Sequence, residues 1–204
     1  DLVTRQMTEK RPNTITKDGI YYLGVDIARM GEDESTFEIF QLRNNHLYQV
    51  ENQITKKTLL SQTTQHIKGL HSLYQFEKIF VDSGGIGAGV FDYLITDDDT
   101  RSVTVAIDNS KQILDKDGKG RKLQKTVKYS HLKMMMEKRR IHLLDEPNIF
   151  QSFKSVQFAY TNDNLGTRHL KIFGNYTHIV EGIANAANAY TWKDLNLVIY
   201  SIKV

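Results

Sequence analysis

KIFVDSGGIGAG, residues 78–89, joins a short apolar run to a glycine-rich turn. The run ends at Asp82, and its length and branched side chains are typical of a strand buried inside a sheet. Four glycines follow it: Gly84, Gly85, Gly87 and Gly89. The chain beyond them, through Leu94, predicts a helix, so this stretch reads as strand, tight turn and helix.

The flanking sequence repeats this alternation. YYLGVDIA, residues 21–28, predicts a second central strand that contains Asp26. Further strands are expected over residues 36–40, 46–50, 103–107, 141–144 and 197–204, with a hairpin turn at 43–45 and a hairpin-like stretch over 156–173. Helices are expected over 58–74, 129–140 and 178–192, and Pro147 marks another helix start. The order predicts an α/β fold, a mixed sheet with helices on both faces.

Composition narrows the classes of protein. The chain has 204 residues, of which 40% are hydrophobic and 25% charged, as in an ordinary single domain. The absence of cysteine excludes a disulfide scaffold, a zinc ribbon and a thiol nucleophile. No apolar run approaches the ~20 residues of a membrane span. The net charge of +3 permits an anionic partner without requiring one.

The amino-terminal segment differs from the rest. Residues 1–18 are polar, lack a clear period and do not begin with Met, so we expect a linker or arm from a longer chain. Residues 19–204 form the expected domain.

Two predicted strands end in a carboxylate within apolar surroundings, at Asp26 and Asp82. Ligands of open α/β sheets gather at the carboxyl ends of strands, and converging carboxylates there are typically held by hard divalent cations. The alternative is that each aspartate caps the turn that follows it. For either residue alone the cap is favoured, and for the pair the metal site is favoured.

A polar stripe marks the predicted helix over residues 177–190. Its members are spaced by three, four and three residues: His178, Glu181, Asn185 and Asn188. Spacing alone favours a solvated face for such a stripe.

Three motifs resemble the nuclease domain of large terminase subunits from tailed bacteriophages. Residues 23–28 with 31–35 are similar to its opening strand, and residues 81–92 to its second acidic motif. The helix beginning at His178 resembles its third motif, usually two acidic residues three apart followed by small residues. The resemblance covers about residues 21–190, and the second motif is the most specific.

The resemblance implies an RNase H-like fold and a metal-dependent endonuclease (a hydrolase) that cuts concatemeric double-stranded DNA. Asp26, Asp82 and Glu181 would then be the metal-binding, catalytic carboxylates, with His178 as a further ligand or proton-handling group. Two Mg²⁺ or Mn²⁺ ions are the expected cofactors, with Asp26 bridging them. Two departures from the family pattern bear on the metals: Glu181 is one methylene longer than the common Asp, and His178 replaces a frequent carboxylate.

Other partners also follow from the resemblance. Such terminases package viral DNA in the host cell cytoplasm with an amino-terminal ATPase, a portal and a small terminase subunit. No G-x-x-x-x-G-K-[ST] motif occurs here, so the ATPase domain is expected to be missing from this chain.

A basic stretch is the candidate surface for the DNA backbone. It comprises Lys116, Lys119, Arg121, Lys122, Lys125 and Lys128. A solvated loop is the alternative. Backbone N–H groups at Gly84 and Gly85 are candidates for phosphate binding, although these glycines serve a tight turn equally well.

Two other functions stay open at this stage. One is a phosphotransferase fragment of the actin and sugar-kinase type, which also uses a strand aspartate and a glycine-rich turn. The other is a non-catalytic module that docks DNA or the portal. The first does not need the helix of His178 and Glu181, and the second does not need a metal.

Overall fold

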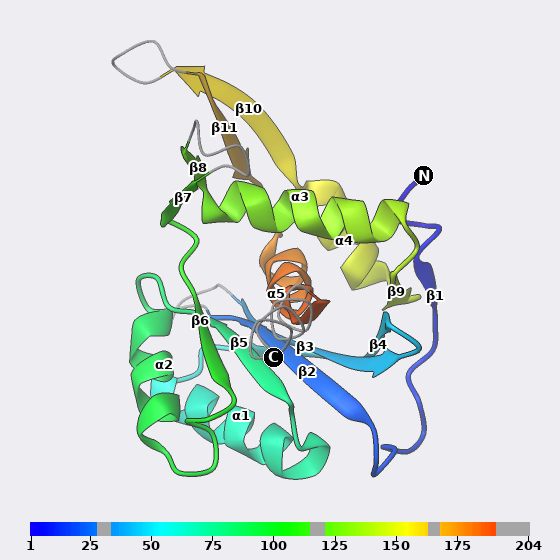
Figure 1. The fold of residues 1–204 in the computed structure, drawn as a ribbon, viewed down its shortest axis with the longest axis vertical. Coiled ribbons are helices and arrows are strands. Elements are labelled where there is room, and N and C mark those ends of the chain that lie inside the picture. The colour runs from blue at the N-terminus through cyan, green and yellow to red at the C-terminus, as the bar shows by residue number, and fades with distance from the viewer. Residues whose placement is uncertain (28–33, 115–120, 163–167, 191–204) are drawn as a thin grey trace, which may run out of the picture.

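The computed structural model describes residues 1–27, 34–114, 121–162 and 168–190, which contain a seven-stranded mixed sheet of order β1-β9-β4-β3-β2-β5-β6 (Figure 1). Its strands are β1 (Met7–Glu9), β2 (Ile20–Asp26), β3 (Glu34–Arg43), β4 (His46–Lys56), β5 (Lys78–Asp82), β6 (Thr104–Ile107) and β9 (Ile141–Leu144). The helices are α1 (Leu60–Tyr74), α2 (Gly87–Thr96), α3 (Gln124–Glu137), α4 (Pro147–Ser155) and α5 (His178–Ala186). Two ribbons lie outside this sheet: β7 (Gln112–Leu114) with β8 (Arg121–Leu123), and β10 (Gln157–Asn162) with β11 (Arg168–Phe173).

The centre of the sheet is an antiparallel meander flanked by parallel strands. β2, β3 and β4 pair antiparallel, β5 and β6 continue parallel from β2, and β9 and β1 continue parallel from β4. Asn44 and Asn45 make the turn between β3 and β4 with φ of 49° and 64°. Two consecutive residues with positive φ form the kind of tight turn that matches strand twist, so the hairpin turn predicted at 43–45 is confirmed.

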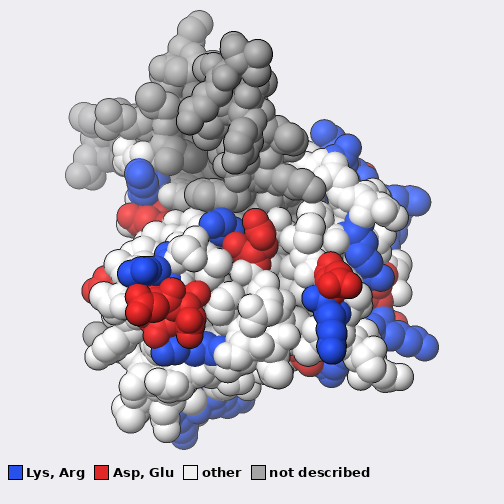
Figure 2. Space-filling view, turned by 60° about the horizontal axis from the view of Figure 1, so that its bottom comes forward, with Lys and Arg blue, Asp and Glu red and all other residues white. Residues whose placement is uncertain are grey.

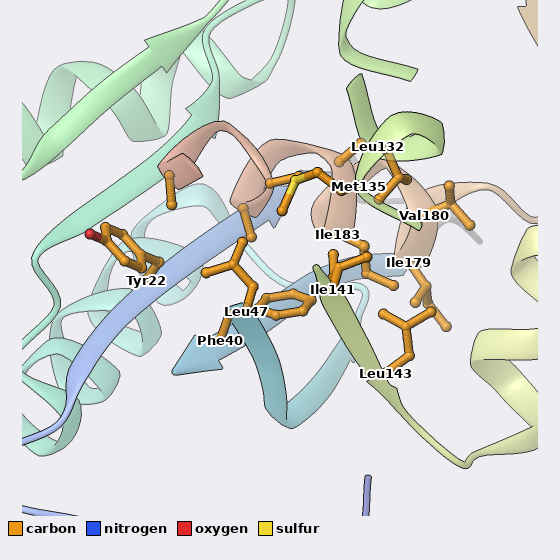
Figure 3. Packing of buried hydrophobic residues seen from close by; sticks show 14 of the residues in the cluster. Tyr22, Phe40, Leu47, Leu132, Met135, Ile141, Leu143, Ile179, Val180 and Ile183 are labelled. Carbon is orange, nitrogen blue, oxygen red and sulfur yellow. The ribbon is translucent and has the colours of Figure 1, made fainter. Parts of the chain in front are cut away.

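Helices cover both faces of the sheet, as the α/β pattern predicts. One apolar core packs α1 and α2 against residues such as Leu23 and Val81. The other packs α3, α4 and α5 against the opposite face, around residues such as Phe40 and Ile141 (Figure 3). Because strand side chains alternate between faces, burial on both sides explains the continuous apolar runs in β2 and β5.

Helix α5 lies unusually close to β2. A Cβ atom at Gly24 would lie 2.1 Å from the carbonyl oxygen of Gly182 and 2.4 Å from the backbone nitrogen of Ala186. Both are backbone atoms of the helix, so neither moves without displacing α5. The absence of a side chain at Gly24 therefore sets the height of α5 above the sheet.

We expect Gly24→Ala to lower the free energy of unfolding by about 3 kcal/mol or more, because the methyl group forces α5 off the sheet. Urea unfolding measures this change. The matched control is Gly69→Ala in the exposed part of α1, where a Cβ has nothing within 4 Å. That substitution should raise the free energy of unfolding by about 1 kcal/mol, since it replaces a glycine within a helix by alanine. An unchanged midpoint for Gly24→Ala would contradict the close packing.

The structure corrects several expected boundaries. α3 begins at Gln124, not at 129, because its first turn is polar and lacks the apolar period that marks a helix. It ends at Glu137, not at 140, since Arg139 takes a φ of 53° before β9 begins. The predicted tail strand over 197–204 lies outside the described residues.

The segment predicted as a linker or arm contributes an edge strand. β1 pairs parallel with β9, with Met7 opposite Leu143. Short strands of this kind have too few residues to show a period. Residues 1–18 as a connection to another domain remain a prediction.

Across the described ranges, none of the helices combines the length and apolar character that crossing a membrane requires.

Candidate active site

Two neighbouring parallel strands deliver Asp26 and Asp82 to one edge of the sheet. β2 and β5 pair Val25 with Val81, the residues directly before the two aspartates. Their carboxylates therefore leave the sheet side by side, and the charge of Asp26 acts on Asp82. The side chain of Asp26 is only 14% exposed, so its charge needs a partner.

Asp82 is held at both carboxylate oxygens. The N–H of Gly84 donates to Oδ1 at 2.8 Å, and Nδ2 of Asn109 donates to Oδ2 at 2.5 Å. Burial raises the pKa of Asp82; the charge of Asp26 also raises it, while the Gly84 bond and the charge of Lys128 lower it. One oxygen thus caps the glycine-rich turn, as the alternative interpretation expects, while the carboxylate as a whole lies at the strand edge beside Asp26.

The first turn of α5 supplies His178. Its Nδ1 lies 2.8 Å from Oδ2 of Asp26, and its carbonyl oxygen accepts a 2.9 Å bond from Oγ1 of Thr36 on β3. An ionised carboxylate only accepts hydrogen bonds, so the proton of the ring lies on Nδ1. His178 therefore orients Asp26, and a metal contact by this ring would require Nε2.

Glu181, one turn further along α5, is buried and surrounded by donors. Nζ of Lys128 lies 2.8 Å from Oε2, and Nζ of Lys125 lies 2.8 Å from Oε1. The hydroxyl of Tyr129 donates to Oε1 at 2.7 Å. Burial raises the pKa of Glu181, but the ammonium groups of Lys128 and Lys125 outweigh burial and lower that pKa to about 2.

This depressed pKa predicts a dependence of stability on pH. Because the folded pKa lies below the ordinary value of 4.5, the ionised form of Glu181 stabilises the fold above about pH 4.5, and this contribution declines as the pH falls toward 2. The shift corresponds to roughly 3 kcal/mol. Urea unfolding from pH 6 down to pH 3 should show a steeper loss of stability for wild type than for Glu181→Gln. Equal slopes would contradict the assigned ion pairs.

Two amide side chains complete the cluster. Asn185 is fully buried; its Nδ2 donates to the carbonyl of Val25, and its Oδ1 accepts from Lys128, both at 2.8 Å. The polar stripe of α5 thus faces the sheet at Glu181 and Asn185, whereas spacing alone had favoured solvent. Asn109 was not predicted. It lies two residues beyond the end of β6, so the signal that identified Asp26 and Asp82 also applied there.

The six basic residues predicted to contact DNA do not lie together on one described surface. Lys125 and Lys128 pair with Glu181, and Lys128 is buried. Arg121 and Lys122 lie in β8, while Lys116 and Lys119 lie outside the described residues. On the face shown in Figure 2, acidic and basic side chains are interspersed, without one large basic patch.

One of the backbone N–H groups of the glycine-rich turn already donates a hydrogen bond. The N–H of Gly84 is bonded to Asp82, and Gly85 adopts a φ of 55°. The turn therefore needs glycine for its geometry, as one of the two interpretations expects. Phosphate binding by Gly84 and Gly85 remains a prediction.

The side chains at the strand edge fit one hard cation. Within the described ranges, no three acidic or histidine side chains are already arranged around a common metal position. Asp26 and Asp82 nevertheless provide neighbouring carboxylates, and Oδ1 of Asn109 is buried without a hydrogen-bond partner. Carboxylate and amide oxygens are the ligands that Mg²⁺ and Mn²⁺ prefer. Glu181, in contrast, already has two ammonium partners.

The mixed sheet, with helices on both faces and carboxylates at the shared end of β2 and β5, defines an RNase H-like α/β fold. Within that class, the chain matches the nuclease domains of large terminases from thermophilic bacteriophages over most of its length. No protein-family model matches the sequence, and no curated protein does.

Three solved structures illustrate the match. The nuclease domain of Thermus phage P74-26 large terminase is 16% identical, with a TM-score of 0.66 over 93% of this chain and 94% of that one. The phage G20c nuclease with bound magnesium is 19% identical, with a TM-score of 0.63 over 85% and 83%. A large terminase from another thermophilic bacteriophage, in complex with ATP-γ-S, is 15% identical, with a TM-score of 0.60 over 90% of this chain and 43% of that one. At these identities the comparisons establish the fold.

Proposed function

We propose that this chain is the metal-dependent endonuclease domain of a viral DNA-packaging terminase large subunit, which cuts concatemeric double-stranded DNA by phosphodiester hydrolysis. The observation that carries the proposal is the placement of Asp26 and Asp82 at the shared end of β2 and β5, with His178 of α5 in contact with Asp26, in a fold shared with phage terminase nucleases. The G20c nuclease, which has this fold, was crystallised with magnesium.

Each residue at the strand edge has a task in this proposal. Asp26 and Asp82 bind the divalent cation, with Oδ1 of Asn109 as a further oxygen donor. When bound, the cation supplies Lewis-acid activation of the phosphate and of the attacking water. His178 holds the orientation of Asp26 through the 2.8 Å contact of Nδ1. Such supporting contacts typically change metal affinity by about 10–100-fold.

The DNA would lie along the basic stretch before and within α3. Lys116, Lys119, Arg121 and Lys122 are the backbone contacts we propose, since Lys125 and Lys128 are engaged by Glu181. Backbone contacts suit an enzyme that cuts with little sequence preference. The ATPase domain, the portal and the small terminase subunit are the proposed assembly partners, in the host cell cytoplasm.

The contact between α5 and Asp26 bears on the alternative functions. A phosphotransferase of the sugar-kinase type needs no such helix, yet here His178 contacts Asp26 directly. A docking module would gain nothing from the buried, mutually repelling carboxylates of Asp26 and Asp82. Both features favour the nuclease.

Cleavage of supercoiled plasmid tests the proposal. Wild-type protein is incubated with Mn²⁺, with Mg²⁺ and with excess EDTA, beside Asp26→Ala in each condition. Nicking and linearisation that require both the metal and Asp26 are the expected result. Cleavage that persists in EDTA would contradict metal dependence. No cleavage by a folded protein that still binds DNA would favour the docking module.

A further inference from the structure

Of the two lysines that pair with Glu181, Lys128 is the more deeply buried. Its Nζ lies 2.8 Å from Oε2 of Glu181 and 2.8 Å from Oδ1 of Asn185. Two oxygen atoms at this distance, one of them charged, form the environment of a bound cation.

Lys128 is also one of the most buried charges in the described part of the protein. Its side chain is 1% exposed, and that of Glu181 is 6% exposed. A buried ammonium is costly unless carboxylate or amide oxygens surround it. The side chain is therefore held in place by this cluster, whereas a surface lysine turns freely in solvent.

Lys128 is connected to the end of β2 through Asn185. Nζ of Lys128 lies 2.8 Å from Oδ1 of Asn185, and Nδ2 of the same amide donates to the carbonyl oxygen of Val25, the residue before Asp26, at 2.8 Å. Lys128 therefore lies between the carboxylate of Glu181 on α5 and the end of the strand that carries Asp26. In a two-metal nuclease, the carboxylates neutralise two divalent cations in such a space.

Charge balance points the same way. The cluster contains three carboxylates (Asp26, Asp82 and Glu181) and two ammonium groups (Lys125 and Lys128, both paired with Glu181), so its net charge is −1 when His178 is neutral. One divalent cation changes the net charge from −1 to +1. A second divalent cation would bring the net charge of this partly buried site to +3, and it would compete with two lysines that already use the oxygens of Glu181.

We propose, on the basis of the nuclease function above, that the Lys128 ammonium takes the place of a second metal ion, so that the site binds one divalent cation. Asp26 and Asp82 bind that cation, and Glu181 holds Lys128 in place. The two-ion cofactor expected from the resemblance is thereby replaced by one ion and one protein cation.

Counting bound Mn²⁺ tests this inference without relying on activity. Isothermal titration calorimetry and Mn²⁺ electron paramagnetic resonance give the stoichiometry, with and without a short DNA duplex. The variants are Lys128→Gln, which keeps hydrogen bonding but removes the charge, and Glu181→Gln. Lys133→Gln is the matched control, since Lys133 lies on the same helix with a side chain that is 70% exposed.

Wild type should bind one Mn²⁺, and Asp82→Asn should lose it. Lys128→Gln should gain a second ion, or bind a second ion at least about tenfold more tightly than wild type does. Lys133→Gln should match wild type, and Glu181→Gln should keep its single ion. If Lys128→Gln does not fold, the number of Mn²⁺ ions bound by wild type and by Glu181→Gln still tests the inference.

Two ions in wild type, free or with DNA, would overturn the inference while leaving a metal-dependent nuclease intact. A single ion in folded Lys128→Gln, with no tighter second site, would overturn it as well, and so would loss of the ion in Glu181→Gln. No bound ion in wild type would overturn the metal dependence in the proposed function together with this inference.

Discussion

Asp82→Asn is expected to abolish plasmid cleavage and, at the same time, to make the protein more stable. Loss of a metal-binding carboxylate removes several kcal/mol of transition-state stabilisation, which corresponds to a fall in rate of roughly 10³-fold or more. The free energy of unfolding near pH 7 should rise, because the raised pKa of Asp82 means that its ionised form costs stability in the folded protein.

The gain in stability follows from the surroundings of Asp82. Burial and the charge of Asp26 raise the pKa of Asp82, so its ionised form is disfavoured in the folded protein near neutral pH. An asparagine has no charge to desolvate, and its Oδ1 still accepts the bond from Gly84. Its new NH2 group replaces Oδ2 and faces Nδ2 of Asn109, so we expect the Asn109 amide to turn over. Oδ1 of Asn109, a buried oxygen without a partner in the present structure, then accepts from the new NH2 group.

Cleavage rate and urea unfolding, measured on the same preparations, check both halves of this prediction. Asp92→Asn is the matched control, because it makes the same change at an exposed position on α2. It should leave both quantities near wild type. Asp82→Asn that is inactive and markedly less stable would assign Asp82 to the turn cap. Full activity would remove it from the site.

The part of the site that was predicted depends on short-range patterns. Asp26 and Asp82 each follow an apolar run, and parallel strands bring their carboxyl ends to the same edge. The β3–β4 hairpin was equally local, because its asparagines carry the turn geometry in their own conformational preferences. Local chemistry of this kind is visible in a single sequence.

The partners of Glu181 were not predictable in the same way. Lys128 and Tyr129 lie 53 and 52 positions from Glu181, and no local period relates α3 to α5. The sequence instead presented Lys128 as one member of a basic run, the usual sign of a solvated surface. Only the close approach of α5 to the sheet, permitted by Gly24, buries Glu181 where α3 can reach it.

The second large effect is expected from Glu181→Ala. This substitution should lower the free energy of unfolding by about 3–5 kcal/mol, because it leaves Lys128 buried without a carboxylate. Asn185 remains within 2.8 Å of Nζ, but an amide oxygen does not balance the charge. Thermal or urea unfolding measures the loss, and loss of cleavage in this variant has to be compared at a temperature where it is folded.

The double variant Glu181→Ala, Lys128→Met separates the two roles of the pair. Removing both charges takes away the uncompensated ammonium, so most of the lost stability should return, as it does when buried ion pairs are replaced by apolar side chains. Cleavage should not return, because no cation then occupies the position of Lys128. If the double variant is as unstable as Glu181→Ala, the ammonium is not the source of the cost. If it cleaves like wild type, the pair is structural and the chemistry depends on Asp26 and Asp82 alone.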